Sequence, residues 1–153
     1  MIYIDMDGTL ARWNPEATDE EIHQPEYYLE RIPEPEVIRL VKLLQRVGKK
    51  VSILTAAFPG CDIAKKEWIR RCGLETVPFI AVPYGESKSS YMAEPGVLLD
   101  DYTANLFDWE NYHPENKGLK FRNRVNGTKG RWKGPSVSDC DTAEAMLAVI
   151  TGM

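Results

Sequence analysis

The sequence predicts one α/β domain with a mostly parallel sheet that is covered by helices on both faces. Short apolar runs alternate along the 153 residues with segments of helical periodicity, and these runs are apolar at consecutive rather than alternate positions. Several of the runs end in acidic or hydroxyl side chains. Right-handed crossovers would bring all of these endings to one edge of the sheet, where α/β proteins bind ligands.

The first half of the chain contains four predicted elements and one insert. The β-branched and aromatic character of residues 1–5 predicts a buried strand. A polar insert that is bounded by prolines follows at about 13–35. Helical periodicity begins at residue 36 and ends at the glycine at position 48. The run 51–55 predicts a second buried strand, and a second helix is expected from 62 to 72.

The second half continues the alternation with shorter elements. They are predicted as a strand at 77–82, a loop with one helical turn at 84–94, a strand at 96–101, a short helix at 102–111 and a strand at 119–121. The final helix carries apolar residues along one face, and Ser138 or Asp139 is expected to be its N-cap.

Composition narrows the class of protein. Apolar residues make up 43% of the chain, and no apolar stretch approaches the ~20 residues that span a bilayer. The amino terminus shows no charged, cleavable export signal. Cys61, Cys72 and Cys140 lack metal-ligand spacing and are interpreted as free thiols in a reducing compartment. We therefore expect a cytoplasmic protein with no membrane partner.

Charge is distributed unevenly. Residues 14–36 carry eight acids and one arginine, whereas residues 117–134 carry seven bases and no acid. The basic segment could steer an anionic substrate, with Trp132 stacking on a base, or it could be a solvated loop that balances the acidic stretch. With an isoelectric point near 5.3, no stable nucleic-acid partner is expected.

Two aspartates with one residue between them, Asp5 and Asp7, end the first predicted strand, and Gly8 follows. Carboxylates this close repel each other unless a cation lies between them. Mg²⁺, which prefers oxygen ligands, is the ion that such a pair predicts. The alternative is turn chemistry without a metal, because Asp and Gly are frequent in turns.

The other strand endings favour the metal. Asp100 and Asp101 end the fourth predicted strand, and two adjacent acids after an apolar run are costly to bury without a partner. Thr55 ends the second strand. Because parallel strands end at the same edge, we expect these side chains to lie close to Asp5 and Asp7.

A phosphate monoester at that edge could be hydrolysed by these groups. Asp5, the Asp7 backbone carbonyl and Asp100 would bind Mg²⁺. Asp5 would attack phosphorus to form an aspartyl-phosphate, and Asp7 would protonate the leaving alkoxide and later deprotonate the attacking water.

A dianionic phosphate beside several carboxylates needs more positive charge than one Mg²⁺ supplies. Lys88 is the natural second cation, and the Thr55 hydroxyl and Ala56 amide could donate hydrogen bonds to phosphate oxygens. Three other lysines could replace Lys88: Lys65, Lys66 and Lys117.

Four segments, in this order, resemble the four motifs of the haloacid-dehalogenase-like (HAD) hydrolase superfamily. They are Asp5-Met6-Asp7-Gly8-Thr9-Leu10, Thr55 after Ser52-Ile53-Leu54, Lys88, and Leu98-Leu99-Asp100-Asp101. The resemblance implies a Rossmann-like, doubly wound fold and Mg²⁺-dependent phosphomonoester hydrolysis. The acid at position 7 argues against dehalogenation, since the dehalogenases of this superfamily lack it.

The same resemblance implies a role for each matching residue. Asp5 becomes nucleophile and metal ligand, Asp7 the acid/base, and Thr55 and Lys88 phosphate binders. Asp100 becomes a metal ligand, and Asp101 a partner that acts next to the ligands or through water; which of these two contacts the metal directly stays open.

A narrower similarity concerns the cytosolic 5′(3′)-deoxyribonucleotidase group. It rests on residues 100–106, Trp109 and residues 118–121, and the insert at 13–35 stands where that group carries a helical cap over the site. This similarity implies an enzyme that releases phosphate from small substrates, namely nucleoside monophosphates.

Three alternatives remain open. The first motif also resembles phosphoprotein phosphatases of the carboxy-terminal-domain type, which would keep the chemistry and change the substrate. A receiver-like phospho-accepting domain would also place Asp, Thr and Lys around Mg²⁺, but without an acid two residues after the phosphoacceptor. A regulatory protein that has lost catalysis would retain the same motifs.

Overall fold

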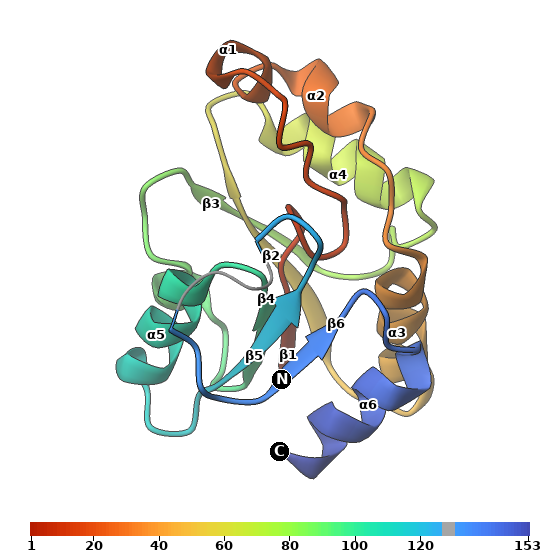
Figure 1. Cartoon of the computed structure of the whole chain (residues 1–153), viewed down its shortest axis with the longest axis vertical. Helices are drawn as coiled ribbons and strands as arrows, with labels where there is room; N and C mark the ends of the chain where they lie inside the picture. Colours follow the sequence, from red (N-terminus) through yellow and green to blue (C-terminus); the bar gives the residue numbers. More distant parts are fainter. Residues whose placement is uncertain (127–130) are drawn as a thin grey trace.

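The computed structural model describes residues 1–126 and 131–153, and Figure 1 shows their arrangement. A six-stranded sheet in the order β3-β2-β1-β4-β5-β6 forms its centre, and all five strand pairings are parallel. The strands are β1 (Ile2–Ile4), β2 (Val51–Ala57), β3 (Phe79–Pro83), β4 (Val97–Asp100), β5 (Lys117–Arg122) and β6 (Ser136–Ser138). The predicted α/β fold with a doubly wound parallel sheet is confirmed.

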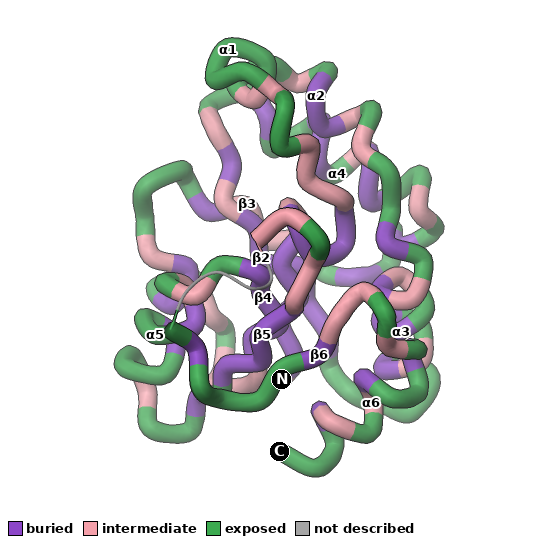
Figure 2. Tube along the Cα trace, viewed as in Figure 1, coloured by how far each residue is buried: buried purple, intermediate pink, exposed green. Residues whose placement is uncertain are grey.

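Helices cover both faces of this sheet. They are α1 (Asp19–Ile22), α2 (Pro25–Leu29), α3 (Pro35–Arg46), α4 (Asp62–Arg71), α5 (Thr103–Tyr112) and α6 (Ala143–Gly152), with a 3₁₀ turn η1 at Lys88–Tyr91. Ile2 and Ile4 of β1 pack in one cluster with α3, α4 and α6, while Tyr3 between them packs in another with α5. Successive strand residues point to opposite faces, so burial on both sides requires the consecutive apolar positions seen in the sequence. Figure 2 shows the resulting buried centre.

The insert after β1 forms the short helices α1 and α2, and α2 lies beside α4 (Figure 1). Tyr27 and Tyr28 of α2 are buried together with Cys61 and Ala64 at the start of α4. The Trp68 indole donates a hydrogen bond to the Arg31 carbonyl at 2.8 Å, which fastens the far end of the insert to the same helix.

The carboxy-terminal region differs from the prediction. The sequence did not predict β6, in which Ser138 pairs with Arg122 of β5, so Ser138 belongs to a strand. The prediction of Ser138 or Asp139 as N-cap of α6 is therefore wrong: the cap is Thr142, whose hydroxyl accepts the Ala145 N–H at 3.2 Å. Ser138 instead donates its N–H to Asp141 at 2.6 Å in the intervening turn.

The basic segment 117–134 is not one solvated loop. Its first six residues form β5, and Lys120 within that strand is buried. Trp132 packs against the α5 side of the sheet and donates to the Pro135 carbonyl, so its ring is not placed to stack on a base. Lys129 lies outside the described residues.

None of the helices in the described ranges has the length and apolar character needed to cross a bilayer.

Candidate active site

The parallel register of β1 and β4 brings three carboxylates together. Ile4 pairs with Leu99, so the residues that follow them, Asp5 and Asp100, leave the sheet side by side. Asp5, Asp100 and Asp101 each offer one oxygen, and these three oxygens lie within 4.8 Å of one another. All three residues are at most 5% exposed. The expected meeting of the strand endings therefore holds for these acids.

Lys88 of η1 provides the ammonium group for this cluster. Its Nζ donates to Asp5 Oδ1 at 2.5 Å and to Asp100 Oδ2 at 2.7 Å. Burial lowers the pKa of Lys88, but the Asp100 and Asp5 carboxylates outweigh it and raise that pKa above its usual range. Lys88 therefore stays charged.

One ammonium does not balance three buried carboxylates. Burial raises the pKa of Asp5 well above its usual value, and the neighbouring carboxylates of Asp100 and Asp101 raise it further against the opposing effect of Lys88. Burial and Asp100 raise the pKa of Asp101 to about 7. A cluster of convergent carboxylate oxygens with excess negative charge has the donor chemistry that a divalent cation requires.

The two adjacent acids of the cluster have different hydrogen-bond partners. Asp100 accepts from the Tyr102 N–H at 2.7 Å and from Asn105 Nδ2 at 2.9 Å. Asp101 Oδ2 accepts from Asn123 at 3.1 Å and from Asn126 at 2.5 Å. Asp101 is thus held by the turn that follows β5, and it belongs to the same oxygen cluster as Asp100.

Asp7 and Thr55 lie beside the cluster and share a partner of their own, Lys65. The Lys65 ammonium on α4 forms a salt bridge with Asp7 and donates to Thr55 Oγ1 at 3.1 Å and to the Ala56 carbonyl at 2.5 Å. Ala56 itself lies within β2, opposite Val82 of β3. Lys65 is 1% exposed, so it is as much a part of the interior as Thr55.

The four lysines considered from the sequence therefore have different places. Lys88 lies at the carboxylate cluster and Lys65 at Asp7, while Lys66 and Lys117 are exposed. Lys117 also pairs with Val97 at the opposite end of β4 from Asp100. The structure thus brings Lys88 to the acids.

Several residues of the site could not be found from the sequence. Asp108 of α5 accepts hydrogen bonds from the hydroxyls on both sides of Lys88, from Ser87 at 2.5 Å and from Ser89 at 2.7 Å. The amides of Asn123 and Asn126 reach Asp101 from more than twenty positions away. No local pattern signals these contacts, because each pairs segments that are distant along the chain.

A cavity of about 690 Å³ adjoins the cluster at Gly8 and Asn123. Its walls come from the insert and from the turn after β5, and include Arg12, Trp13 and Val125. This size lies within the range typical of small-molecule sites. Asn123 donates to Asp101 Oδ2, so the cavity borders the cluster through this residue, although none of the three clustered acids lines it.

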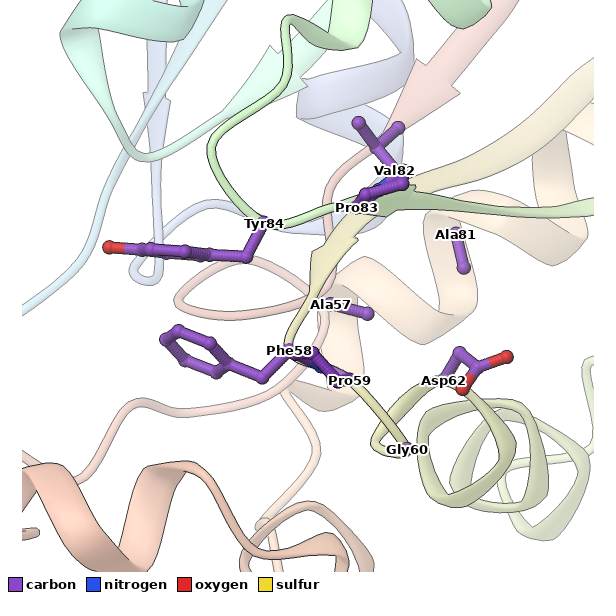
Figure 3. A pocket seen from close by; sticks show the side chains of 9 residues that line it. All are labelled: Ala57, Phe58, Pro59, Gly60, Asp62, Ala81, Val82, Pro83 and Tyr84. Atoms are coloured by element: carbon purple, nitrogen blue, oxygen red, sulfur yellow. The ribbon is translucent and has the colours of Figure 1, made fainter.

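A smaller hollow of about 260 Å³ lies beyond the ends of β2 and β3 (Figure 3). The Phe58 and Tyr84 rings lie 4.1 Å apart between centroids at its border, and His23 packs on Phe58 at 4.0 Å. Figure 3 shows these two rings pointing the same way and Asp62 on the other side of the hollow. None of the clustered acids lines it.

Comparison with known proteins gives matches in structure. No protein-family model and no curated protein matches the sequence. The crystal structure of D,D-heptose 1,7-bisphosphate phosphatase from Burkholderia thailandensis is similar with a TM-score of 0.61 and 13% identity, over 99% of this chain and 98% of that one. The crystal structure of a protein from Mesorhizobium loti that is described as a HAD-like phosphatase is similar with a TM-score of 0.59 and 15% identity, over 99% of this chain and 85% of that one. Over nearly its whole length, this chain has the Rossmann-like α/β fold of these HAD-type phosphatase structures.

Proposed function

We propose that the chain is a HAD-type, Mg²⁺-dependent phosphomonoester hydrolase with Asp5 as the nucleophile. The observation that carries this proposal is the convergence of three buried carboxylates on one lysine at the carboxyl edge of the sheet, with Asp7 and Thr55 beside them. Such a buried, unbalanced cluster is unfavourable for folding and is expected where a site serves chemistry. The similarity in fold to two HAD-type phosphatase structures supports the same proposal.

The carboxylates would hold the metal, because their oxygens are the ligands that Mg²⁺ prefers. Asp5, Asp100 and the Asp7 backbone carbonyl are the proposed ligands, with Asp101 next to them or bound through water; the oxygen cluster includes Asp101 as well as Asp100. When bound, Mg²⁺ would neutralise phosphate oxygens and orient the phosphoryl group. We propose that Lys88, Thr55 and the Ala56 amide supply the remaining phosphate contacts.

Two steps follow from these positions. A carboxylate oxygen of Asp5 attacks phosphorus, the ester P–O bond breaks, and the leaving alkoxide takes a proton from Asp7. A water molecule then attacks the phosphorus of the aspartyl-phosphate and gives a proton to Asp7. The bond between phosphorus and Asp5 breaks, which releases inorganic phosphate and restores both side chains.

We propose nucleoside monophosphates as the substrates, and thus a 5′(3′)-nucleotidase. The narrower sequence similarity around residues 100–121 supports this class, as does the cavity of about 690 Å³ beside the cluster. Its lining combines the flat Trp13 ring with the polar groups of Arg12 and Asn14, which suits a base and a sugar. The proposal includes one domain over residues 1–153 with the insert at 13–35 as its cap, and a cytoplasmic location, which the three free cysteines support.

The first test is release of inorganic phosphate from a panel of substrates. The panel contains deoxy- and ribonucleoside monophosphates, a sugar bisphosphate, a phosphopeptide and an aryl phosphate. Preference for a nucleotide supports the nucleotidase. Preference for the phosphopeptide or the sugar bisphosphate would assign a different substrate class to the same phosphomonoester hydrolysis. Absence of turnover on every substrate contradicts the proposed function.

Removal of the metal is expected to stop the reaction. In EDTA, phosphate release should fall to background and return with excess Mg²⁺, because the carboxylate cluster then regains its counter-charge. Since Mg²⁺ binds the folded cluster, a hundredfold excess over its Kd should raise the unfolding temperature by roughly 5–10 °C. Asp100→Asn should reduce this rise, and Asp19→Asn, which changes an exposed acid on α1, should leave it unchanged. Full activity in EDTA would contradict the metal.

Asp108 is expected to affect activity through Lys88, which lies between the two serines that donate hydrogen bonds to Asp108. Asp108→Ala removes the acceptor of both hydroxyls, so Lys88 should lose its fixed position and kcat/KM should fall about tenfold. Asp108→Asn keeps one side-chain oxygen and should lie between the wild type and the Ala variant. Because Asp108 is exposed, the free energy of unfolding should change by only about 1 kcal/mol. Equal activity in all three proteins would show that η1 needs no anchor.

A further inference from the structure

We propose that Lys65 is a positioning residue of this site: it holds Asp7 and Thr55 in place and does not contact the substrate. The inference rests on the proposed function and assigns different tasks to the two buried lysines, Lys65 and Lys88. It follows from counting hydrogen-bond donors and acceptors around each ammonium group.

The Lys65 ammonium has no donor left for a substrate. A lysine ammonium carries three N–H donors and no acceptor. Those of Lys65 go to Asp7 Oδ2, to Thr55 Oγ1 and to the Ala56 carbonyl. A phosphate oxygen could bind Lys65 only by displacing one of these partners.

The Lys88 ammonium, in contrast, has a donor to spare. Within the described part of the chain it donates to two acceptors, Asp5 Oδ1 and Asp100 Oδ2. The third N–H is available to a phosphate oxygen brought to Asp5. The geometry thus gives phosphate binding to Lys88 and leaves Lys65 a different task.

The contact with Thr55 determines the direction of its hydroxyl. Because the Lys65 ammonium can only donate, Thr55 Oγ1 is the acceptor in that pair, and its own O–H is left to donate elsewhere. In this structure the hydroxyl donates to the Ala56 carbonyl at 3.3 Å, which is a long hydrogen bond for an O–H donor. A phosphate oxygen would be a better acceptor, so Lys65 prepares Thr55 to donate to one.

The contact with Lys65 gives the two carboxylate oxygens of Asp7 different roles. Oδ2 is held by Lys65, while Oδ1 is buried and finds no hydrogen-bond partner among the described residues. An orphaned buried carboxylate oxygen is costly unless a ligand completes it. Oδ1 is therefore the oxygen that would give a proton to the leaving alkoxide and take one from water.

The insert shields Lys65 from solvent. The Lys65 Nζ lies 4.5 Å from the centre of the Tyr28 ring on α2, and Tyr28 is itself 1% exposed. The Tyr28 hydroxyl is fixed by donating to the Ile22 carbonyl at 2.6 Å. With water excluded, each of the three hydrogen bonds of Lys65 is stronger than at a surface, as holding two reactive groups requires.

The kinetic test compares Lys65→Met, Lys88→Met and, as the matched control, Lys66→Met, an exposed neighbour on the same helix. Lys65→Met should lower kcat about 10–100-fold while KM and the inhibition constant of inorganic phosphate change less than about threefold. Lys88→Met should raise both of those constants, and Lys66→Met should change nothing. All assays run well below the unfolding temperature of each variant, with the folded fraction measured by circular dichroism.

Two outcomes of this comparison would overturn the inference: an unchanged kcat in Lys65→Met, or a phosphate inhibition constant that rises in Lys65→Met as much as in Lys88→Met. A double variant separates positioning from a general loss of packing. Lys65→Met combined with Thr55→Val should lose less than the product of the two single losses, since both act on one hydroxyl. A full product would indicate independent, structural effects.

A measurement without turnover keeps the inference testable if a variant fails to fold. With ¹⁵N-labelled lysine and Mg²⁺, the Lys65 ammonium signal should differ between the wild-type protein and each of the variants Asp7→Asn and Thr55→Val. In the wild-type protein it should not shift when inorganic phosphate is added. The Lys88 signal should shift with phosphate. A phosphate-induced shift at Lys65 as large as at Lys88 would make it a binding residue. If wild-type protein neither turns over nor binds phosphate, the proposed function fails, and the Asp7 and Thr55 shifts still decide the placement of Lys65.

Discussion

Asp5→Asn is expected to reduce kcat for phosphate release by at least about 10³-fold, the largest effect of any substitution considered for this protein. The carboxamide is not a nucleophile, so the aspartyl-phosphate cannot form. The change is nearly isosteric in a residue that is 4% exposed, so the surrounding chain should keep its place. Phosphate release and trapping of the phosphorylated protein with a slow substrate would be measured together.

The same variant should be no less stable than the wild type in the absence of metal. Burial and neighbouring carboxylates already raise the pKa of Asp5 well above its usual value, so removing its charge relieves repulsion within the cluster. A substitution of a functional rather than a structural residue is expected to remove activity and to leave the unfolding temperature equal or higher. Asp19→Asn, at an exposed position on α1, is the matched control and should retain full activity. Substantial turnover by Asp5→Asn would assign the nucleophile elsewhere.

Gly8→Ala is expected to give the second large effect, a loss of both stability and activity. Gly8 has φ +86°, and a Cβ added there would lie 2.2 Å from Asp101 Oδ2. Asp101 cannot move freely, because Asn123 and Asn126 hold the same oxygen. Backbone strain and this contact together should lower the free energy of unfolding by about 2–4 kcal/mol. Displacement of Asp101 should also weaken Mg²⁺ binding.

The matched control for this variant is Gly48→Ala. Gly48 follows α3 with φ +76° and has no atom within 4 Å of an added Cβ, so this change incurs the backbone strain alone, about 1–2 kcal/mol. Denaturant unfolding of both variants isolates the contact with Asp101 as the difference between them. Equal losses would show that the carboxylate moves aside without cost.

Much of the fold could be predicted from local pattern. Helix α3 begins one residue before its predicted start and ends two residues before Gly48, because an apolar stripe and this glycine mark it. The strand predicted at 77–82 lies at Phe79–Pro83, since Val77 belongs to the turn before it, where its N–H bonds the Leu74 carbonyl. The short edge strand β6 escaped prediction because three residues carry no periodicity of their own.

The sequence by itself determined which acids meet. Asp5, Asp100 and Asp101 each end an apolar strand, and a parallel sheet brings such endings to one edge regardless of the detailed packing. Only the tertiary structure decided which further side chains complete the site around those acids. Four side chains reach the site from helices and turns whose orientation depends on long-range packing: Lys65, Asp108, Asn123 and Asn126. Side-chain partners of this kind depend on three-dimensional proximity, and nothing in the local spacing of residues encodes it.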